Sequence, residues 1–202
     1  LIVPTFHMHL PFYMLNISYK GFLCVYFLLT FPILWYYVIQ VLNNEVTYIM
    51  KCAIGQDSHK FSENADKKLI LAGVHIKNHP GLIANSDGDV IYHALTNAIS
   101  GITSVNILGK TADIMCKGGI TDSSLYVKEA LKSLEYKIEH VSFTVECLTP
   151  VLFPYIEEMK GNIAMLLGID KKDVGLTATS GEGLSSFGKG SGIMCFCIIT
   201  VS

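Results

Sequence analysis

The chain has 202 residues, of which 50% are hydrophobic and 16% charged, enough for one domain with a sizeable core, with or without an appendage. Its formal net charge of -2 excludes recruitment of nucleic acid by bulk charge. The six cysteines include no Cys-x-x-Cys pair and no disulfide-like spacing, so we expect reduced thiols and a cytoplasmic protein.

Residues 1–49 differ in composition from the rest of the chain. Only Lys20 and Glu45 carry formal charges there, and the apolar run 21–42 is long enough to cross a bilayer as a helix. A translation start at Met50 would remove that run. We expect 50–202 to be the functional domain and 1–49 to be absent from the working protein. Membrane contact is expected only if residues 21–42 are retained as an anchor or signal sequence.

Strand and helix patterns begin directly after this segment. Residues 50–57 are typical of a strand, 58–68 of a loop, and 69–71 with 74–76 of a small hairpin. Ser86 is the expected N-cap of a helix that carries Asp87 and Asp89 in its first turn and ends at Gly101. Residues 104–121 are predicted to form a loop.

The second half of the domain continues the alternation. A helix should follow Thr121 or Asp122, a strand should cover 138–147, and a third helix should end at Gly168. The last two strands are expected at 174–179 and 192–201. This order predicts an α/β (α+β) fold in which helices cover one face of a mixed β-sheet. Because the final strand is apolar on both faces, the other sheet face should meet copies of the chain around a symmetry axis.

Three side chains suggest a metal site. Asp57 and His59 are two apart on an extended segment and should point the same way. With His93 they form an oxygen, nitrogen, nitrogen set, which in zinc enzymes leaves a fourth position for substrate or water. Asp89 lies four residues before His93 and either orients it or matches the helix dipole. The competing interpretation is an ordinary surface loop beside a well-capped helix.

Two further segments are suited to phosphate. The Ser86 hydroxyl and the unpaired N–H groups at the start of its helix form a candidate anion site. Residues 177–192 combine hydroxyls and glycines with Glu182 and Lys189, and a loop of this kind can wrap phosphates. The Glu182 carboxylate is a hard ligand of the type that Mg²⁺ or Mn²⁺ prefers. A flexible loop between strands, without function, is the alternative.

Four segments resemble the 2-C-methyl-D-erythritol 2,4-cyclodiphosphate synthase family. They are Gln56-Asp57-Ser58-His59, Leu71-Ala72-Gly73-Val74, Asn85 through Leu95 and Ala178 through Ile193. The similarity covers 50–202 and none of 1–49. It implies a homotrimer with active sites at subunit interfaces. It also implies a phosphorus-oxygen lyase of non-mevalonate isoprenoid biosynthesis, which cyclises 4-diphosphocytidyl-2-C-methyl-D-erythritol 2-phosphate and releases CMP.

The same resemblance implies roles for individual residues. Asp57, His59 and His93 would hold Zn²⁺ or another divalent transition metal, and Glu182 would hold Mg²⁺ or Mn²⁺ with the substrate. Ser180 and Asn85 take the catalytic positions that usually carry threonine and histidine. The implied substrate-binding residues are Asp57, His59, Asn85, Ser86, Asn106, Leu108, Asp113, Cys147, Pro150, Val151, Leu152, Phe153, Thr179, Ser180, Glu182, Ser186 and Lys189.

Some positions depart from the family pattern. Asn85 and Val151 replace a histidine and a lysine, which removes two positive contacts and predicts weaker substrate affinity. Lys189 replaces an arginine and loses its bidentate geometry, in a chain whose fifteen basic residues are all lysine. These changes leave open a second hypothesis, a non-catalytic zinc-binding trimer of the same fold with a ligand-sensing or interaction role. The intact metal set favours the enzyme.

Overall fold

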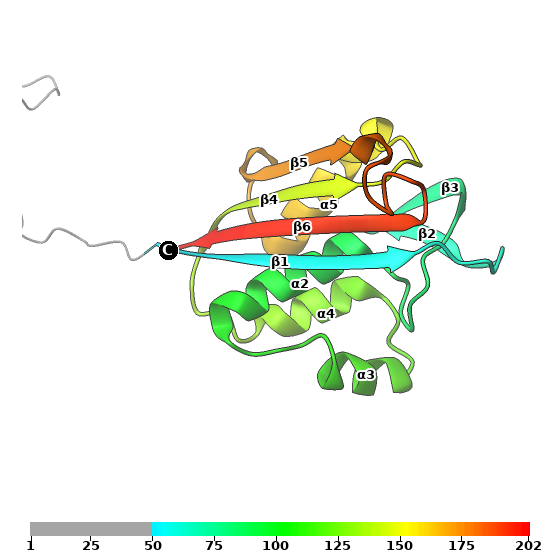
Figure 1. Cartoon of the computed structure of the whole chain (residues 1–202). Coiled ribbons are helices and arrows are strands. Elements are labelled where there is room, and N and C mark those ends of the chain that lie inside the picture. Colours follow the sequence, from blue (N-terminus) through cyan, green and yellow to red (C-terminus); the bar gives the residue numbers. More distant parts are fainter. Residues whose placement is uncertain (1–49) are drawn as a thin grey trace, which may run out of the picture. The chain divides into compact units, whose positions relative to one another are not determined.

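A computed structural model describes residues 50–202 of the chain (Figure 1). These residues lie within one compact unit. The predicted N-terminal extension 1–49, with its candidate membrane span at 21–42, lies outside the described residues. Within 50–202, none of the helices combines the length and the apolar character needed to cross a membrane.

The domain alternates strands and helices along the chain, with three short 3-10 turns between them. The strands are β1 Lys51–Lys60, β2 Lys68–Leu71, β3 Val74–Pro80, β4 Ile138–Glu146, β5 Val174–Thr179 and β6 Gly192–Val201. The helices are α2 Val90–Thr103, α3 Lys110–Lys117, α4 Ser123–Leu131 and α5 Ile156–Leu167. The 3-10 turns are η2 Phe153–Tyr155, η3 Lys171–Asp173 and η4 Gly181–Gly183.

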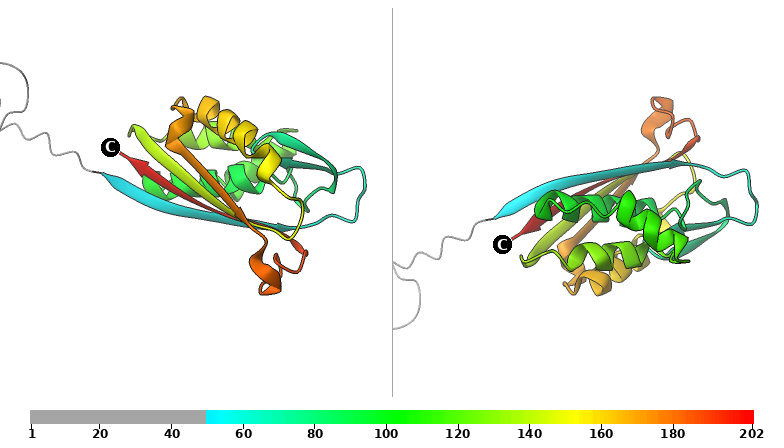
Figure 2. Two further views of the ribbon diagram at one scale, coloured as in Figure 1. Left: turned by 90° about the horizontal axis from the view of Figure 1, so that it is seen from above. Right: turned by 90° about the horizontal axis from the view of Figure 1, so that it is seen from below.

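Four of these strands form one mixed sheet in the order β1-β6-β4-β5. The β1–β6 and β6–β4 pairs are antiparallel, whereas β4 and β5 are parallel. Strands β2 and β3 form a separate antiparallel hairpin. Helices α2, α4 and α5 lie on one side of the sheet (Figures 1 and 2). The predicted mixed sheet with helices over one face is confirmed, and β1 and β5 are its two edges.

One face of strand β6 forms the sheet side of the core, beneath the helices. Cys195, Cys197 and Ile199 alternate along the strand, face the helices and are fully buried, together with Phe143 of the neighbouring strand β4. Side chains two residues apart on a strand share a face, so this row forms the sheet side of the core. Truncation of a fully buried phenylalanine such as Phe143 to alanine costs about 3–5 kcal/mol of stability.

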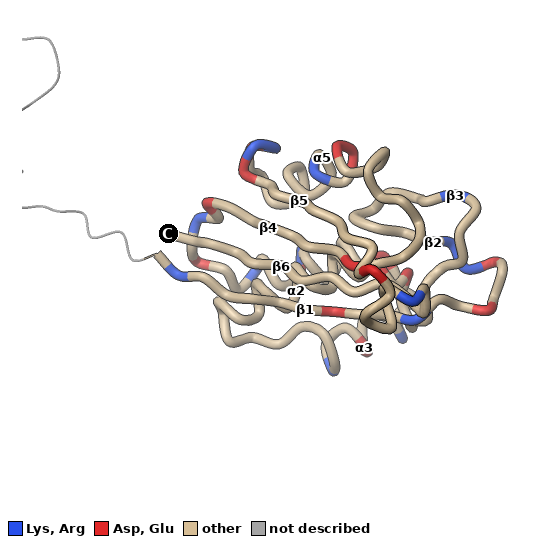
Figure 3. The backbone as a smooth tube through the Cα atoms, turned by 45° about the horizontal axis from the view of Figure 1, so that its top comes forward, with Lys and Arg blue, Asp and Glu red and all other residues tan. Residues whose placement is uncertain are grey.

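The opposite sheet face carries an apolar patch, which we define as Ile54, Phe196 and Ile198. The exposed fractions of these side chains are 63%, 38% and 49%. Ile54 and Ile198 are direct neighbours across the β1–β6 pair, and no charged residue lies along β6 (Figure 3). The prediction that the last strand is apolar on both faces is therefore confirmed.

Helix α2 packs directly on the backbone of β1. A Cβ atom at Gly55 would lie 2.1 Å from the backbone oxygen of Ala94 and 2.4 Å from the nitrogen of Ala98, so only glycine fits there. Near the C-terminal end of α2, a Cβ at Gly101 would lie 2.9 Å from the Cβ of Ala53. Small residues on both elements thus bring the helix unusually close to the strand, and this close contact builds the site described below.

The predicted boundaries of this helix were wrong at both ends. The helix begins at Val90, and Asp89 rather than Ser86 is the N-cap, so Asp87 and Asp89 precede the first turn. The helix also continues past Gly101, because that glycine provides clearance against β1 rather than ending the helix.

Two predicted loops were also wrong. Strand β1 extends through 58–60 because these residues pair with 192–194 of β6. Within the predicted loop 104–121, the segment Lys110–Lys117 forms α3. None of the residues of α3 is fully buried. Its half-buried face, Ala112, Met115 and Cys116, spans only two turns between Gly109 and Gly118, and these glycines indicated a loop.

Candidate metal centre and active site

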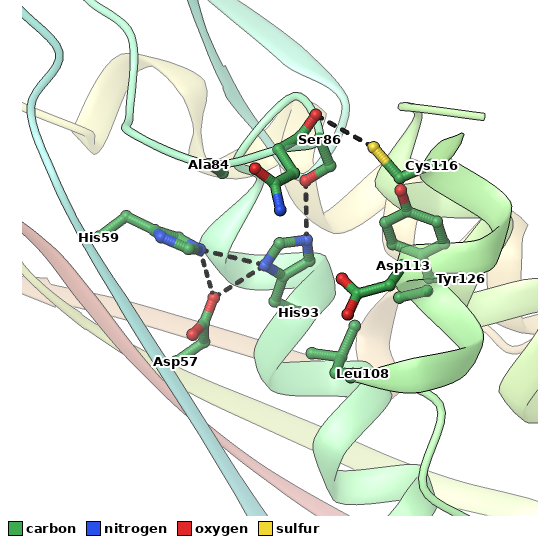
Figure 4. A pocket seen from close by; sticks show the side chains of 12 residues that line it. Asp57, His59, Ala84, Ser86, His93, Leu108, Asp113, Cys116 and Tyr126 are labelled. Carbon is green, nitrogen blue, oxygen red and sulfur yellow. Dashed lines mark hydrogen bonds and ion pairs between the residues drawn. The ribbon is translucent and has the colours of Figure 1, made fainter. Parts of the chain in front are cut away.

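Three predicted ligands meet where α2 crosses β1. Asp57 Oδ2 lies 2.8 Å from His59 Nε2 and 2.8 Å from His93 Nδ1, and the two imidazole nitrogens are 3.2 Å apart (Figure 4). Tetrahedral zinc with ligand distances of about 2.0–2.1 Å separates its ligand atoms by roughly 3.3 Å. The three atoms therefore converge on one point at a spacing close to that of a zinc site. The predicted set is brought together and can hold a divalent metal ion.

The Asp57 carboxylate is suited to a cation. Burial raises its pKa, but hydrogen bonds and charge interactions with His59 and His93 outweigh this effect and hold the pKa well below its ordinary value. Asp57 is therefore ionised at neutral pH, and it offers a negative oxygen next to two imidazole nitrogens. This donor set fits a borderline metal such as Zn²⁺ better than a purely oxygen-bound ion.

The second nitrogen of His93 faces two serines. Its Nε2 lies 2.9 Å from Ser123 Oγ and 3.2 Å from Ser86 Oγ. Ser123 is fully buried, and its hydroxyl donates a short hydrogen bond to the Asp87 carboxylate. The roles of Ser123 and Asp87 were missed from the sequence, because Ser123 arrives from α4 and no spacing connects it with the ligands.

Asp89 has a different role from the one proposed for it as the residue that orients His93. Its carboxylate accepts hydrogen bonds from the N–H groups of Ile91 and Tyr92, at 3.1 and 3.2 Å, and so caps α2. It also accepts from the N–H groups of Ala72 and Gly73, at 2.9 and 2.8 Å, and so ties the β2–β3 turn to the helix. The alternative of a carboxylate matched to the helix dipole is confirmed. The predicted anion site at the helix start is wrong, because Asp89 already occupies those N–H groups.

A cavity of about 360 Å³ opens beside the three ligands (Figure 4). Cys116 and Tyr126, which the sequence did not single out, contribute to its wall. The Cys116 thiol donates to the backbone oxygen of Asn85 at 3.2 Å, and burial raises the pKa of Tyr126 to about 12, so its phenol stays neutral. The predicted site residues that line this cavity are Asp57, His59, Asn85, Ser86, His93, Leu108 and Asp113.

A second group of predicted residues lies where β4 and β5 end. They line a separate cavity of about 230 Å³, which shares no lining residue with the first cavity among residues 50–202. Since β1 and β5 are opposite edges of a four-stranded sheet, they are separated by about 14 Å, three strand spacings. The predicted residues around this second cavity are Cys147, Pro150, Val151, Leu152, Phe153, Thr179 and Ser180.

The loop between β5 and β6 carries the remaining predictions. Ser180 donates to Glu182 Oε1 at 2.7 Å, and the Glu182 side chain is exposed in a left-handed backbone conformation with a φ of 48°. Ser186 and Lys189 are exposed on the same loop, and Asn106 is exposed between α2 and α3. Within one chain, neither of the two cavities is lined by Asn106, Glu182, Ser186 or Lys189.

Fold and site together define an α+β protein with a group of side chains that can hold a metal ion beside an open cavity. The model of the YgbB family matches residues 50–202. The chain is 51% identical over 159 residues to 2-C-methyl-D-erythritol 2,4-cyclodiphosphate synthase of Chlamydia caviae, covering 77% of this chain and 90% of that protein. It is 45% identical over 158 residues to the synthase of Chlamydia trachomatis serovar D, covering 76% and 89%.

Solved structures agree with these relatives. The bifunctional IspDF of Campylobacter jejuni superposes with a TM-score of 0.69 at 31% identity, covering 75% of this chain and 42% of that one. The Plasmodium falciparum IspF–CDP complex superposes with a TM-score of 0.63 at 27% identity, covering 75% and 95%. The chain therefore belongs to the YgbB family, the 2-C-methyl-D-erythritol 2,4-cyclodiphosphate synthases, and the resemblance seen in the sequence is confirmed.

Proposed function

We propose that residues 50–202 form a metal-dependent phosphorus-oxygen lyase of non-mevalonate isoprenoid biosynthesis. It converts 4-diphosphocytidyl-2-C-methyl-D-erythritol 2-phosphate to 2-C-methyl-D-erythritol 2,4-cyclodiphosphate and CMP. Family membership and the names of the relatives support this reaction. The convergence of Asp57 Oδ2, His59 Nε2 and His93 Nδ1 is the observation that carries it.

The reaction brings two anionic phosphate groups together, and the chain must overcome their repulsion. Asp57, His59 and His93 would hold Zn²⁺, and the exposed Glu182 carboxylate would hold Mg²⁺ or Mn²⁺ with the substrate. When bound, these ions neutralise phosphate charge and hold the reacting groups in line. The nucleophile is a phosphate that is already ionised near neutral pH, so the chain needs no general base. The work left to the side chains is binding and orientation.

The position of the two cavities supports a site shared between subunits. The metal ligands lie at the β1 edge of the sheet, and the residues expected to bind the CDP group lie at the β5 edge. We therefore propose that a ligand touching both uses two chains, with the first cavity from one and the second from its neighbour. The exposed apolar patch of Ile54, Phe196 and Ile198 supplies a surface for assembly. We infer a homotrimer, as in the family resemblance.

The substrate-binding roles follow the same division. In the first cavity Asn85, Ser86, Leu108 and Asp113 would contact the methylerythritol phosphate, with Asn106 beside them. At the β5 edge of the neighbouring chain, the cytidine would be surrounded by Cys147, Pro150, Val151, Leu152 and Phe153. A relative solved as a CDP complex supports a CDP-linked ligand. Thr179, Ser180, Ser186 and Lys189 would contact the phosphates from the β5–β6 loop. Ser180 and Asn85 keep the catalytic positions assigned from the sequence.

We place this reaction in the cytoplasm. The described cysteines, Cys52, Cys116, Cys147, Cys195 and Cys197, are free thiols, which suits a reducing compartment. Fractionation of cells that express the full chain would test this placement. Recovery in the membrane fraction would show that residues 21–42 are retained and act as an anchor.

The direct test is CMP release by the purified full chain, and by the protein started at Met50, with Zn²⁺ and Mg²⁺ present. Phosphorus NMR should detect the cyclic diphosphate in step with CMP, and a chelator should stop both products. Zinc binding without any CMP release would overturn the proposed reaction. That result would favour the second hypothesis, a non-catalytic zinc-binding trimer, for which the neutral Asn85 and Val151 are the supporting observation.

A further inference from the structure

The His93 imidazole is held from two sides. Nδ1 faces the other two ligands, at 2.8 Å from Asp57 Oδ2 and 3.2 Å from His59 Nε2. Nε2 faces away from them, toward Ser123 Oγ at 2.9 Å and Ser86 Oγ at 3.2 Å. His93 and both serines are buried. The orientation of the ring is therefore set by buried contacts. The hydrogen bond that Nε2 makes to a serine determines how Nδ1 is presented to a metal ion.

The directions of these hydrogen bonds can be assigned from donor chemistry. Without metal, Nδ1 lies 2.8 Å from the ionised Asp57 Oδ2 and donates to it. With a metal bound, the neutral imidazole has one N–H and one lone pair, and it must present the lone pair to the metal at Nδ1. The hydrogen then lies on Nε2, which donates to a serine oxygen. The Ser123 hydroxyl hydrogen is already given to Asp87 Oδ1, and an ionised carboxylate only accepts. Ser123 Oγ must therefore accept from His93, so the chain of hydrogen bonds runs His93 to Ser123 to Asp87.

Asp87 is itself fixed in place. Its Oδ2 accepts from the Ser123 backbone N–H at 3.1 Å, and its Oδ1 also accepts from the Asp89 N–H at 3.0 Å. Its own N–H donates to the Thr121 oxygen at 2.8 Å. Asp87 thus accepts hydrogen bonds from both the hydroxyl and the backbone N–H of Ser123, the first residue of α4. Carboxylates commonly orient metal-bound histidines directly, and here a serine is inserted between the two.

Ser86 differs from Ser123 in its surroundings. Ser86 lines the cavity beside the metal ligands, whereas Ser123 does not. The Ser86 oxygen accepts from the Gly88 N–H at 3.2 Å. If His93 donates to Ser123, the Ser86 hydroxyl hydrogen is free to point into the cavity, where it can donate to an anionic ligand.

We propose that Ser123, backed by Asp87, is the positioning residue for His93. It fixes the hydrogen on Nε2 and turns Nδ1 toward the metal, and it leaves the Ser86 hydroxyl available for a phosphate oxygen. The consequence for metal binding rests on the proposed function, whereas the hydrogen bond from His93 Nε2 to Ser123 can be measured with or without metal.

The test compares Ser123→Ala with Ser124→Ala in the full-length chain. Both changes remove a hydroxyl from the first turn of α4, but Ser124 only donates its backbone N–H, to Asp122. Zn²⁺ affinity is measured by competition with a chromogenic chelator. We expect Ser123→Ala to bind zinc about 10–100-fold more weakly, and Ser124→Ala to match the wild type. Nitrogen-15 NMR should find the His93 Nε2 hydrogen held in a hydrogen bond and slow to exchange with water in wild type, with or without metal, and in faster exchange in Ser123→Ala.

Two further variants keep the proposal testable if Ser123→Ala fails to fold. Asp87→Asn keeps the shape but replaces one of the two accepting oxygens with an NH₂ donor, which must face either the Ser123 N–H or the Ser123 hydroxyl, so zinc affinity should again fall. Ser86→Ala should raise KM for the substrate and leave zinc affinity unchanged.

The outcomes separate this proposal from the proposed function. Wild-type zinc affinity and unchanged exchange of the His93 Nε2 hydrogen in either Ser123→Ala or Asp87→Asn would overturn the positioning role. Zinc loss in Ser86→Ala equal to that in Ser123→Ala would also overturn it, because both serines would then serve His93 alike. Failure of the wild type to bind zinc would refute the metal site, and the exchange measurement on the metal-free protein would still decide the role of Ser123.

Discussion

The two cavities of this domain differ in how complete they are within one chain. The cavity at the β1 edge, beside the three metal ligands, is lined by β1, α2, α3, α4 and the segment before α2. Its ligands are buried or half-buried and joined by hydrogen bonds of 2.8–3.2 Å. At the β5 edge, Val151 and Phe153 are 73% and 82% exposed, and Glu182 lies on an open loop. The first region is ordered by its own chain. The second presents its groups outward, as expected of a surface that is completed by a neighbour.

This difference predicts that substitutions at the two edges will separate metal binding from substrate turnover. Changes at the β1 edge should affect zinc first and turnover as a consequence. Changes at the β5 edge should affect turnover or substrate affinity and leave zinc in place.

The largest effect is expected for His93→Ala. Loss of one of three ligands should remove stoichiometric zinc and reduce CMP release by roughly 1000-fold or more, since a catalytic metal supplies several kcal/mol of charge stabilisation. Zinc content by atomic absorption and CMP release by chromatography measure the two effects. His140→Ala removes an exposed histidine on β4 and should change neither. Full activity of metal-free His93→Ala would refute the role of the metal.

Glu182→Gln should act at the other edge only. The neutral amide is a poor ligand for Mg²⁺, so we expect kcat to fall about 100-fold, the loss of roughly 3 kcal/mol of transition-state stabilisation. Zinc content should stay at the wild-type value because Glu182 lines neither the metal cavity nor the cluster of ligands. Raising the Mg²⁺ or Mn²⁺ concentration should recover part of the activity. Zinc loss in this variant would contradict the separation of the two edges.

Gly55→Ala tests the packing that creates the metal cavity. The new methyl group would meet backbone atoms of Ala94 and Ala98 at 2.1 and 2.4 Å, and must push α2 away from β1. We expect a loss of about 1–3 kcal/mol in the free energy of unfolding, together with weaker zinc binding, because His93 moves with the helix. Urea unfolding and chelator competition measure both quantities.

The matched control for this change is Gly161→Ala. Gly161 lies within α5, and a Cβ there would meet no described heavy atom within 4 Å. Alanine should therefore stabilise the protein by roughly 0.5–1 kcal/mol through its higher helix propensity. Equal destabilisation by the two substitutions would show that close packing at Gly55 is unimportant.

Acid should act through Asp57 in the metal-free protein. Because its folded pKa is lowered from the ordinary 3.8, the carboxylate contributes stability that is present above about pH 4 and is lost as pH falls through the folded pKa. Asp57→Asn should thus reduce the free energy of unfolding by about 1.5–3 kcal/mol near neutral pH, and the difference from wild type should shrink below pH 4. A difference that grows with acidification would have the wrong sign and would refute the assignment.

Part of this site could be predicted from the sequence, because two of the metal ligands are close neighbours along the chain. Asp57 and His59 lie two apart on one strand, and the chemistry of their side chains, together with the family resemblance, singled out His93. Ser123 could not be found in this way, because its meaning depends on where α4 meets α2. Gly55 was also missed, since one glycine in a strand does not reveal that a helix backbone lies 2.1 Å from its absent Cβ. Contacts between distant elements decide both cases.

The fold shows the same limit. The alternation in β4 and β6 predicted the sheet and its apolar second face, because successive side chains of a strand point to opposite faces of the sheet. Helix α3 was missed because it is short, buries no residue fully and lies between glycines. The sequence could not decide between the two roles considered for Asp89, because the N–H groups of Ala72 and Gly73 that bind its carboxylate come from a hairpin earlier in the chain.

The smallest effect is expected for Val151→Lys. Val151 is 73% exposed at the β5 edge, where the family usually carries a lysine, so the change restores a positive charge without disturbing the core. We expect KM for the substrate to fall about threefold to fivefold, equivalent to at most about 1 kcal/mol for an exposed charge. The improvement should weaken as salt is raised, because solvent screens exposed charges. Zinc affinity and kcat should stay unchanged.

Met165→Lys provides the control for Val151→Lys. Met165 is 81% exposed on α5 and lies in neither active-site cavity, so the same charge added there should leave KM unaltered. An equal gain from both substitutions would mean that net charge alone attracts the substrate. A gain confined to Val151 would place the nucleotide phosphates at the β5 edge. Because the metal ligands lie at the opposite edge, such a result would support the proposal that each substrate bridges two chains.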